Sequence, residues 1–244
     1  MSLQILTNRV FWALMISHSM FGVIYNTAIS WLPRYYNSQF GLDVRSSSFL
    51  SVLPWVAMAA GTNLSGWLAD HLINTKTLTT TRTRKLLQTL GSVGPAICLL
   101  YLSHGAPGGA ATAAAAAGLA GGGASRSLAG AAAAAAAAGG MSAEEQQRQL
   151  TWAVALLVMT MALLGLQAGG FAATHQDIST RLASVLFGTT NAAASLAGSF
   201  FVLLVGVLLD ATGSWALVFN LVGLCCLASA AAFLTLASSE PQFD

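Results

Sequence analysis

Six long stretches of this 244-residue chain contain no Lys, Arg, Asp or Glu, and this absence limits the fold more than any other feature. The stretches cover approximately residues 10–32, 46–69, 86–103, 151–174, 183–209 and 215–237. Each is close to the length of about 20 apolar residues with which a helix crosses the hydrocarbon core of a bilayer. Because the core offers no water to a bare backbone, such segments span it as helices. The sequence predicts an all-α membrane protein with six transmembrane helices.

The composition agrees with a lipid bilayer as the surroundings and excludes several classes of function. Charged residues make up 7% of the chain, against about 25% in soluble domains. The net charge of +2 is small and scattered, so we expect no nucleic-acid partner. The sequence shows no metal-ligand spacing, phosphate loop or catalytic carboxylate pair, so we expect no cofactor, no metal and no enzyme. A Gly-Ala-Ser stretch at residues 123–125 does not fit an intramembrane serine protease, because it lies outside the spans.

Alanine and glycine dominate residues 105–150, which separate the third span from the fourth. Arg126 lies within this segment, and glycine disfavours helix, so we interpret it as a low-complexity linker rather than a seventh span. The predicted organisation is a three-helix unit at 1–104, the linker at 105–150, a second three-helix unit at 151–237 and a tail at 238–244.

A short pattern occurs once in each unit, as Gly66-Trp67-Leu68-Ala69-Asp70 and as Gly206-Val207-Leu208-Leu209-Asp210. Each copy closes the second span of its unit, so the two aspartates lie on opposite sides of the membrane. Two three-helix repeats of inverted topology produce this placement, and many secondary transporters are built from such repeats. We therefore expect two inverted repeats.

Basic residues indicate the orientation. The connection between the second and third spans holds Lys76, Arg82, Arg84 and Lys85. Six spans place Arg9, Arg181 and the C-terminus on the same side, against Arg34 and Arg45 on the other. The excess of Lys and Arg predicts that the first side is cytoplasmic, or the equivalent stroma or matrix.

Polar residues in the first and fifth spans are the candidates for contact with a substrate. His18 and Tyr25 share one face of the first span, and Asn26 lies on an adjacent stripe. Asn191 lies near the start of the fifth span among glycines and threonines. Two interpretations stay open: a substrate-lined cavity, or hydrogen bonds between packed helices.

Charged residues on the basic side are the candidates for a gate. Asp177 and Arg181 are four residues apart, so a helical turn would pair them. Together with Asp70 and Arg84 they could form a cluster that breaks when a cavity opens inward; plain helix capping is the alternative.

Several strings, taken in order, resemble the C-terminal half of the anion:cation symporter family, a branch of the major facilitator superfamily that includes phosphate and vesicular glutamate carriers. The strings are Phe11-Trp12-Ala13-Leu14, Ile16-Ser17-His18, Trp31-Leu32-Pro33, Ser51-Val52-Leu53-Pro54-Trp55, Gly66-Trp67-Leu68-Ala69-Asp70, Arg84-Lys85, Gly94-Pro95-Ala96, His175-Gln176-Asp177-Ile178 and Ser184-Val185-Leu186. The similarity is greatest to plastid phosphate transporters of plants and algae.

The resemblance implies secondary active transport of an anion, most of all inorganic phosphate, coupled to sodium or protons by alternating access. It implies a plastid envelope or thylakoid membrane and a partner, the N-terminal six-helix half of the same transporter, which supplies basic residues for the anion. It also adds Lys85 and His175 to the gate candidates. An organic anion such as ascorbate or another carboxylate, and a truncated, non-transporting half, are the alternatives.

Two departures from the family's pattern bear on these expectations. Phe21 stands where glutamate carriers have an arginine, which argues against a dicarboxylate. The loop at residues 174–181 keeps the charged pair of the family's Asn-His-x-Asp-Ile-Ala-Pro-Arg motif but has lost its Asn and its Ala-Pro step.

Overall fold

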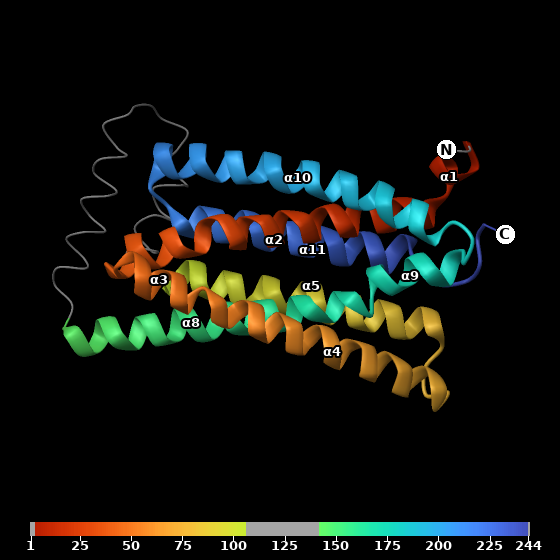
Figure 1. The fold of residues 1–244 in the computed structure, drawn as a ribbon, viewed down its shortest axis with the longest axis horizontal. Helices are drawn as coiled ribbons and strands as arrows, with labels where there is room; N and C mark the ends of the chain where they lie inside the picture. Colours follow the sequence, from red (N-terminus) through yellow and green to blue (C-terminus); the bar gives the residue numbers. More distant parts are fainter. Residues whose placement is uncertain (1–2, 106–141, 244) are drawn as a thin grey trace.

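A computed structural model describes residues 3–105 and 142–243, and the described chain is helical apart from short connections (Figure 1). The elements are α1 (Leu3–Thr7), α2 (Arg9–Phe40), α3 (Val44–Leu50), α4 (Val52–Asn74), α5 (Thr80–Gly105), α8 (Ala143–Gly165), the 3₁₀ turn η1 (Leu166–Ala168), α9 (Phe171–Ile178), α10 (Ala183–Thr212) and α11 (Trp215–Leu236). Most of the predicted linker lies outside the described residues.

Four of the predicted spans coincide with one long helix each, whereas the second begins in the short helix α3 and continues in α4, and the fourth is divided among α8, η1 and α9. The fourth span also begins at Ala143 rather than at residue 151, so the end of the predicted linker is helical. The reason is a capping box: Ser142 Oγ accepts from the Glu145 N–H, and the Glu145 carboxylate accepts from the Ser142 N–H. The basic connection is likewise shorter than predicted, because α5 already begins at Thr80.

Four helical segments are long and apolar enough to cross a membrane: Thr80–Gly105, Ala143–Ile178, Ala183–Thr212 and Trp215–Leu236. Helices α2 and α4 are 32 and 23 residues long but are not among these four. Polar residues such as Ser17, His18 and Asn26 lower the mean hydropathy of α2, and Asn63 lowers that of α4. Composition alone therefore supports four spans of the predicted six.

The long helices form two groups of three that lie side by side (Figure 1). Helix α2 packs against α10 and α11, α8 packs against α4 and α5, and α5 packs against α11 to join the groups. In order of spans, the first touches the fifth and sixth, the fourth touches the second and third, and the third touches the sixth. Exchanging the first three spans with the last three leaves this pairing unchanged.

Glycines let the backbones approach closely at two equivalent crossings. Where α2 meets α10, a Cβ on Gly22 would overlap the carbonyl group of Ala194. Where α4 meets α8, a Cβ on Gly61 would overlap the carbonyl group of Ala162. Small residues are the usual means of close packing in lipid, where helix association cannot rely on the hydrophobic effect.

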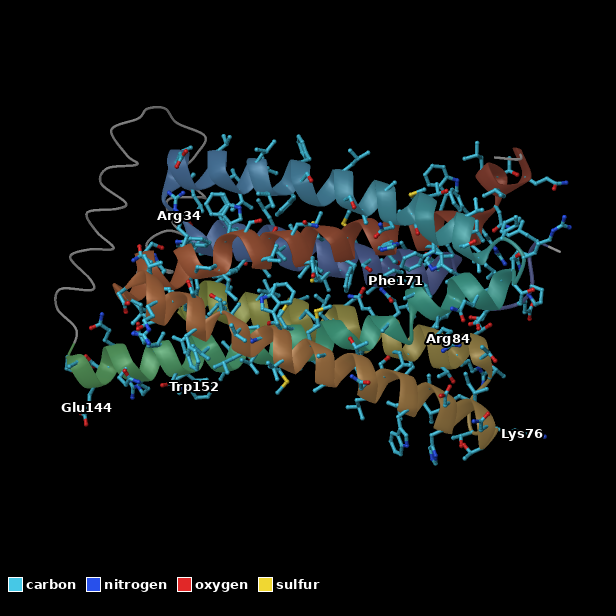
Figure 2. The ribbon with its side chains drawn as sticks, viewed as in Figure 1. Arg34, Lys76, Arg84, Glu144, Trp152 and Phe171 are labelled. Atoms are coloured by element: carbon cyan, nitrogen blue, oxygen red, sulfur yellow. The ribbon has the colours of Figure 1, made fainter. Side chains whose placement is uncertain are left out.

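The two ends of the bundle differ in their charges. The two chain termini, the α4–α5 turn and α9 lie at one end, which we call the basic end (Figure 1). Figure 2 shows Lys76 and Arg84 toward this end and Arg34 at the other. At that opposite end Arg34 lies 3.8 Å from Asp210, and both side chains are mostly exposed.

Candidate functional site

The fourth span is interrupted where it nears the basic end. Helix α8 ends at Gly165, a single turn of 3₁₀ helix follows, and α9 starts after Gly169 and Gly170. Both glycines are required by close approach: a Cβ on Gly169 would meet Ser65 and Leu87, and one on Gly170 would meet Gln88. The eight-residue helix α9 is therefore joined to α8 by a two-glycine step.

Side chains of α4 and α5 satisfy the backbone groups that the interruption frees. Ser65 Oγ donates to the Leu166 carbonyl over 2.7 Å and accepts from the Gly169 N–H over 2.8 Å. Gln88 Oε1 accepts from the N–H of Phe171, the first residue of α9, over 3.1 Å. Unpaired backbone groups are costly in a membrane interior, so these contacts make an interrupted helix tolerable there.

Gln88 also ties the interruption to two further elements. Its Nε2 donates to Gln167 Oε1 over 3.1 Å and to Ser229 Oγ of α11 over 3.0 Å. Gln167 Nε2 in turn donates to the Gly91 carbonyl over 2.7 Å. The three side chains Gln88, Gln167 and Ser229 are fully buried. The start of α9 thus rests on a polar network that reaches α5 and α11.

An ion pair fixes the other end of α9. Arg84 Nε donates to Asp177 Oδ2 over 2.7 Å, and Nη2 donates to Oδ1 over 3.1 Å. The same guanidinium donates from Nη1 to the Gly169 carbonyl over 3.2 Å. The two side chains are only 13% and 17% exposed, so water screens the pair weakly.

This geometry corrects one sequence prediction. Asp177 pairs with Arg84 of α5 and not with Arg181. Helix α9 ends at Ile178, and Ser179 is extended, so Arg181 does not lie one helical turn beyond Asp177. Arg181 is exposed and forms no ion pair within the described residues.

The remaining gate candidates lie apart from the ion pair. Lys85 Nζ donates to the Leu234 carbonyl of α11 over 2.8 Å. Asp70 is exposed near the end of α4, and among residues 3–105 and 142–243 it has no hydrogen-bonding or charged partner. His175 is buried and forms part of a different cluster. The structure thus joins only Arg84 and Asp177 of the predicted gate, and the functional role of all six stays a prediction.

His18 and His175 come together through a threonine. Thr190 Oγ1 of α10 lies 2.9 Å from His18 Nδ1 and 2.9 Å from His175 Nε2. His175 Nδ1 lies 3.2 Å from the Ala172 carbonyl. All three side chains are at most 4% exposed. A residue predicted to touch substrate and one predicted to gate therefore belong to one hydrogen-bonded group across α2, α9 and α10.

The other predicted substrate residues are placed differently. Tyr25 is half-buried, and its ring packs against Phe21 and Trp55. Asn26 Nδ2 donates to the Gly22 carbonyl of its own helix, and it lies against Gly198 of α10, as the packing interpretation expects. Asn191 is exposed on α10.

A cavity of about 890 Å³ opens between α9 and α10. Its polar lining residues are His175, Gln176, Thr180 and Ser184, and Phe187 forms part of its wall. The cavity thus reaches from the loop between the two helices to the histidine cluster.

Sequence reasoning missed Thr190 as a bridge, and it missed the interruption of the fourth span. The interruption had a visible signal in the sequence, because Gln167, Gly169 and Gly170 follow one another closely near the end of an otherwise apolar run. The bridging role of Thr190 had no signal in the sequence, since its two histidine partners are 172 and 15 residues away.

Comparison with known proteins agrees with this architecture. Residues 2–144 match the Major Facilitator Superfamily. Probable anion transporter 6 of Oryza sativa subsp. japonica is 28% identical over 251 residues, which cover 99% of this chain and 49% of that protein. The chloroplastic ascorbate transporter of Arabidopsis thaliana is 30% identical over 88% of this chain and 32% of its own length. Chloroplastic probable anion transporter 6 of the same plant is 31% identical over a region that covers 95% of this chain and 37% of that protein.

The chain spans between about a third and a half of the length of these relatives. The family match covers more than half of the chain, and the helical bundle, with four helical segments long and apolar enough to cross a membrane, fits it. The chain is a multi-pass membrane protein of the Major Facilitator Superfamily, a transporter family and not a family of enzymes.

Proposed function

We propose that this chain forms one half of a secondary active anion transporter, with inorganic phosphate as its substrate. A second six-helix bundle completes the translocation path, and the anion passes between the two halves by alternating access. Support comes from the family, from relatives named as anion transporters and from the share of their length that the chain spans.

The observation that carries the proposal is the way in which α9 is attached to the rest of the bundle. A transporter needs an element with two arrangements, and broken helices near the path are a recurring solution. Helix α9 is joined to α8 through Gly169 and Gly170, and Arg84 holds Asp177 near its other end. We infer that this ion pair is the inner latch and that α9 moves about the glycine step when the latch opens.

The pairing of helices supports the inverted repeat on which alternating access depends. Exchanging the units 1–104 and 151–237 reproduces every major contact between long helices. The glycine crossings of α2 with α10 and of α4 with α8 follow the same exchange. We infer six spans, with α2 and α4 as the two that composition alone does not identify.

In this arrangement the basic end faces the cytoplasm or the stroma, and the membrane belongs to a plastid. Several relatives are named as chloroplastic, which supports the compartment. Among the predicted substrate residues, His18, Tyr25 and Asn191 remain candidates. Asn26 is the weaker one, because its amide is used by its own helix.

Transport by the full gene product in liposomes tests the proposal. We expect uptake of labelled phosphate that depends on an ion gradient, and exchange of labelled for unlabelled phosphate without one. If neither occurs, the proposal is wrong and a half-sized, non-transporting membrane protein is favoured. An organic anion is the second candidate substrate, because one relative is named an ascorbate transporter. Inhibition of phosphate uptake by excess ascorbate, compared with excess sulfate, distinguishes the two.

A further inference from the structure

We propose that His18, Thr190 and His175 form a proton-binding site that couples the movement of the anion to the movement of a proton. The coupling rests on the proposed transport function, whereas binding of the proton can be measured without it.

The neutral cluster has one consistent arrangement of hydrogens. The Ala172 carbonyl can only accept, so His175 carries its hydrogen on Nδ1 and offers a lone pair on Nε2. The Thr190 hydroxyl then donates to His175 Nε2 and accepts from His18 Nδ1–H, each over 2.9 Å. The result is a directional chain from α2 through α10 to α9.

The same geometry accommodates one additional proton. When His175 Nε2 takes up a proton, it donates to Thr190 Oγ1, and the Thr190 hydroxyl turns to the Phe187 carbonyl, 3.1 Å away. The two lone pairs of Thr190 Oγ1 then accept from both histidines, and every polar hydrogen keeps an acceptor. The Phe187 carbonyl is the group that makes the second state possible.

Aromatic rings surround the place where the positive charge would reside. The ring of Phe187 lies 5.2 Å from that of His175 and 5.1 Å from that of His18. Phe171 lies 4.8 Å from His18. Aromatic faces attract a cation, and the attraction is larger where water is excluded.

The charged groups nearby leave this charge uncompensated by protein. At this end of the bundle, on the elements packed against α9 and in the C-terminal tail that hydrogen-bonds to its end, they are, among the described residues, Arg9 on α2, Arg82, Arg84 and Lys85 on α5, Asp177 on α9, Arg181 before α10, and the exposed Glu240 of the tail. Arg84 and Asp177 neutralise one another, and Lys85 binds a carbonyl. Of the tyrosines, Tyr25 on α2 is held in an aromatic stack. Glu240 is exposed, so a protonated His175 has no carboxylate partner of its own within residues 3–105 and 142–243.

An anion can supply that missing charge. His175 lines the 890 Å³ cavity between α9 and α10, which also reaches Gln176 and Ser184. A phosphate ion in this cavity would favour the protonated cluster, and the protonated cluster would favour the phosphate, as linkage requires. One proton and one anion would then be held by neighbouring groups.

The test compares Thr190→Val with Thr190→Ser in the full gene product. Valine keeps the shape of threonine and removes the hydroxyl, whereas serine retains it. In liposomes with an inward proton gradient and no sodium, we expect proton-driven phosphate accumulation to fall about tenfold in Thr190→Val, the factor that corresponds to one lost buried hydrogen bond. Thr190→Ser should restore it, and Thr235→Val, whose hydroxyl bonds its own helix, should match the wild type.

Nitrogen-15 NMR of the histidine rings gives the second readout. In the wild type, protonation of one histidine should shift the ring nitrogens of the other, and Thr190→Val should abolish this dependence. Two buried histidines that stay neutral down to about pH 4.5, well below the ordinary histidine pKa, would overturn the site. If phosphate accumulation is driven by sodium and does not depend on pH, the proposed coupling of phosphate to protons is wrong. Loss of all phosphate exchange in the wild type would instead contradict the transport function, and the NMR result would still decide the site.

Discussion

Arg84 of α5 donates to both carboxylate oxygens of Asp177 near the end of α9, at 2.7 and 3.1 Å, and also to the carbonyl of Gly169, two residues before that helix begins. One guanidinium thus contacts the chain on both sides of α9. Such a bidentate pair between Arg and a carboxylate is stronger and more specific than a single hydrogen bond. At the opposite end of the bundle, Arg34 and Asp210 form a single exposed contact of 3.8 Å, of the kind that contributes little.

The first prediction contrasts these two pairs. Asp177→Asn should release α9 and make the cavity between α9 and α10 more accessible, because it leaves Arg84 without its charged partner. The measurement is the labelling rate of Ser184→Cys, a cavity-lining position, by a maleimide applied at the basic end, with the three native cysteines replaced. We expect about a tenfold rise, which corresponds to 1.4 kcal/mol, a modest part of the cost of breaking a buried pair.

Asp210→Asn is the matched control, since it removes the same charge from an exposed pair. Its labelling rate should stay within about twofold of the parent. Equal effects of the two substitutions would contradict the assignment of the latch to Arg84 and Asp177.

The second prediction concerns the two-glycine step. Gly170→Ala should lower the free energy of unfolding by about 1–3 kcal/mol, because its Cβ would meet the Gln88 side chain and backbone. Gly66→Ala has open space around its Cβ and lies within α4, so it should stabilise by about 0.5–1 kcal/mol. Thermal unfolding of the full gene product in detergent measures both. A Gly170→Ala protein as stable as the wild type would show that the step is looser than the structure indicates.

Much of the fold was predictable because bilayer energetics act on long segments. The absence of charge over some 20 residues does not depend on tertiary contacts, and five of the six predicted spans begin or end within a few residues of a helix boundary. The interruption of the fourth span was not predicted, because it requires Ser65 and Gln88 on other helices to satisfy the freed backbone. An apolar run gives no information on such partners.

Several residues predicted for the site form contacts in the structure, although their functional roles stay predictions. His18, His175, Arg84 and Asp177 all lie where the structure forms buried polar contacts. The pairing of Asp177 with Arg181 was wrong because spacing along a helix applies only while the helix continues, and α9 ends at Ile178. Contacts such as those of Thr190 depend on helix packing, which composition does not determine.

The third prediction tests the polar support of α9. Gln88→Leu should destabilise the protein by roughly 2–4 kcal/mol, because the Phe171 N–H and the side-chain oxygen Oε1 of Gln167 each lose a buried partner. Gln146→Leu, at an exposed position in the first turns of α8, is the matched control and should change stability little. Thermal unfolding in detergent again supplies the measurement. Equal stabilities for Gln88→Leu and its control would mean that water or another group replaces the amide.

The last prediction concerns the repeated Gly-x-Leu-x-Asp pattern, whose two aspartates have different surroundings in the structure. Asp210 contacts Arg34, whereas Asp70 has no charged partner among the described residues. An exposed carboxylate at the basic end can still pair when the bundle takes its other arrangement, or with the second six-helix half. Asp70→Asn should therefore slow phosphate uptake by about threefold to fivefold, since an exposed ion pair contributes up to about 1 kcal/mol. It should leave the melting temperature unchanged, because no contact in this structure is lost. Asp210→Asn should leave the uptake rate near that of the wild type. A melting temperature that falls with Asp70→Asn, or uptake rates equally reduced by both substitutions, would show that Asp70 acts on the folding of this bundle and not on its change of state.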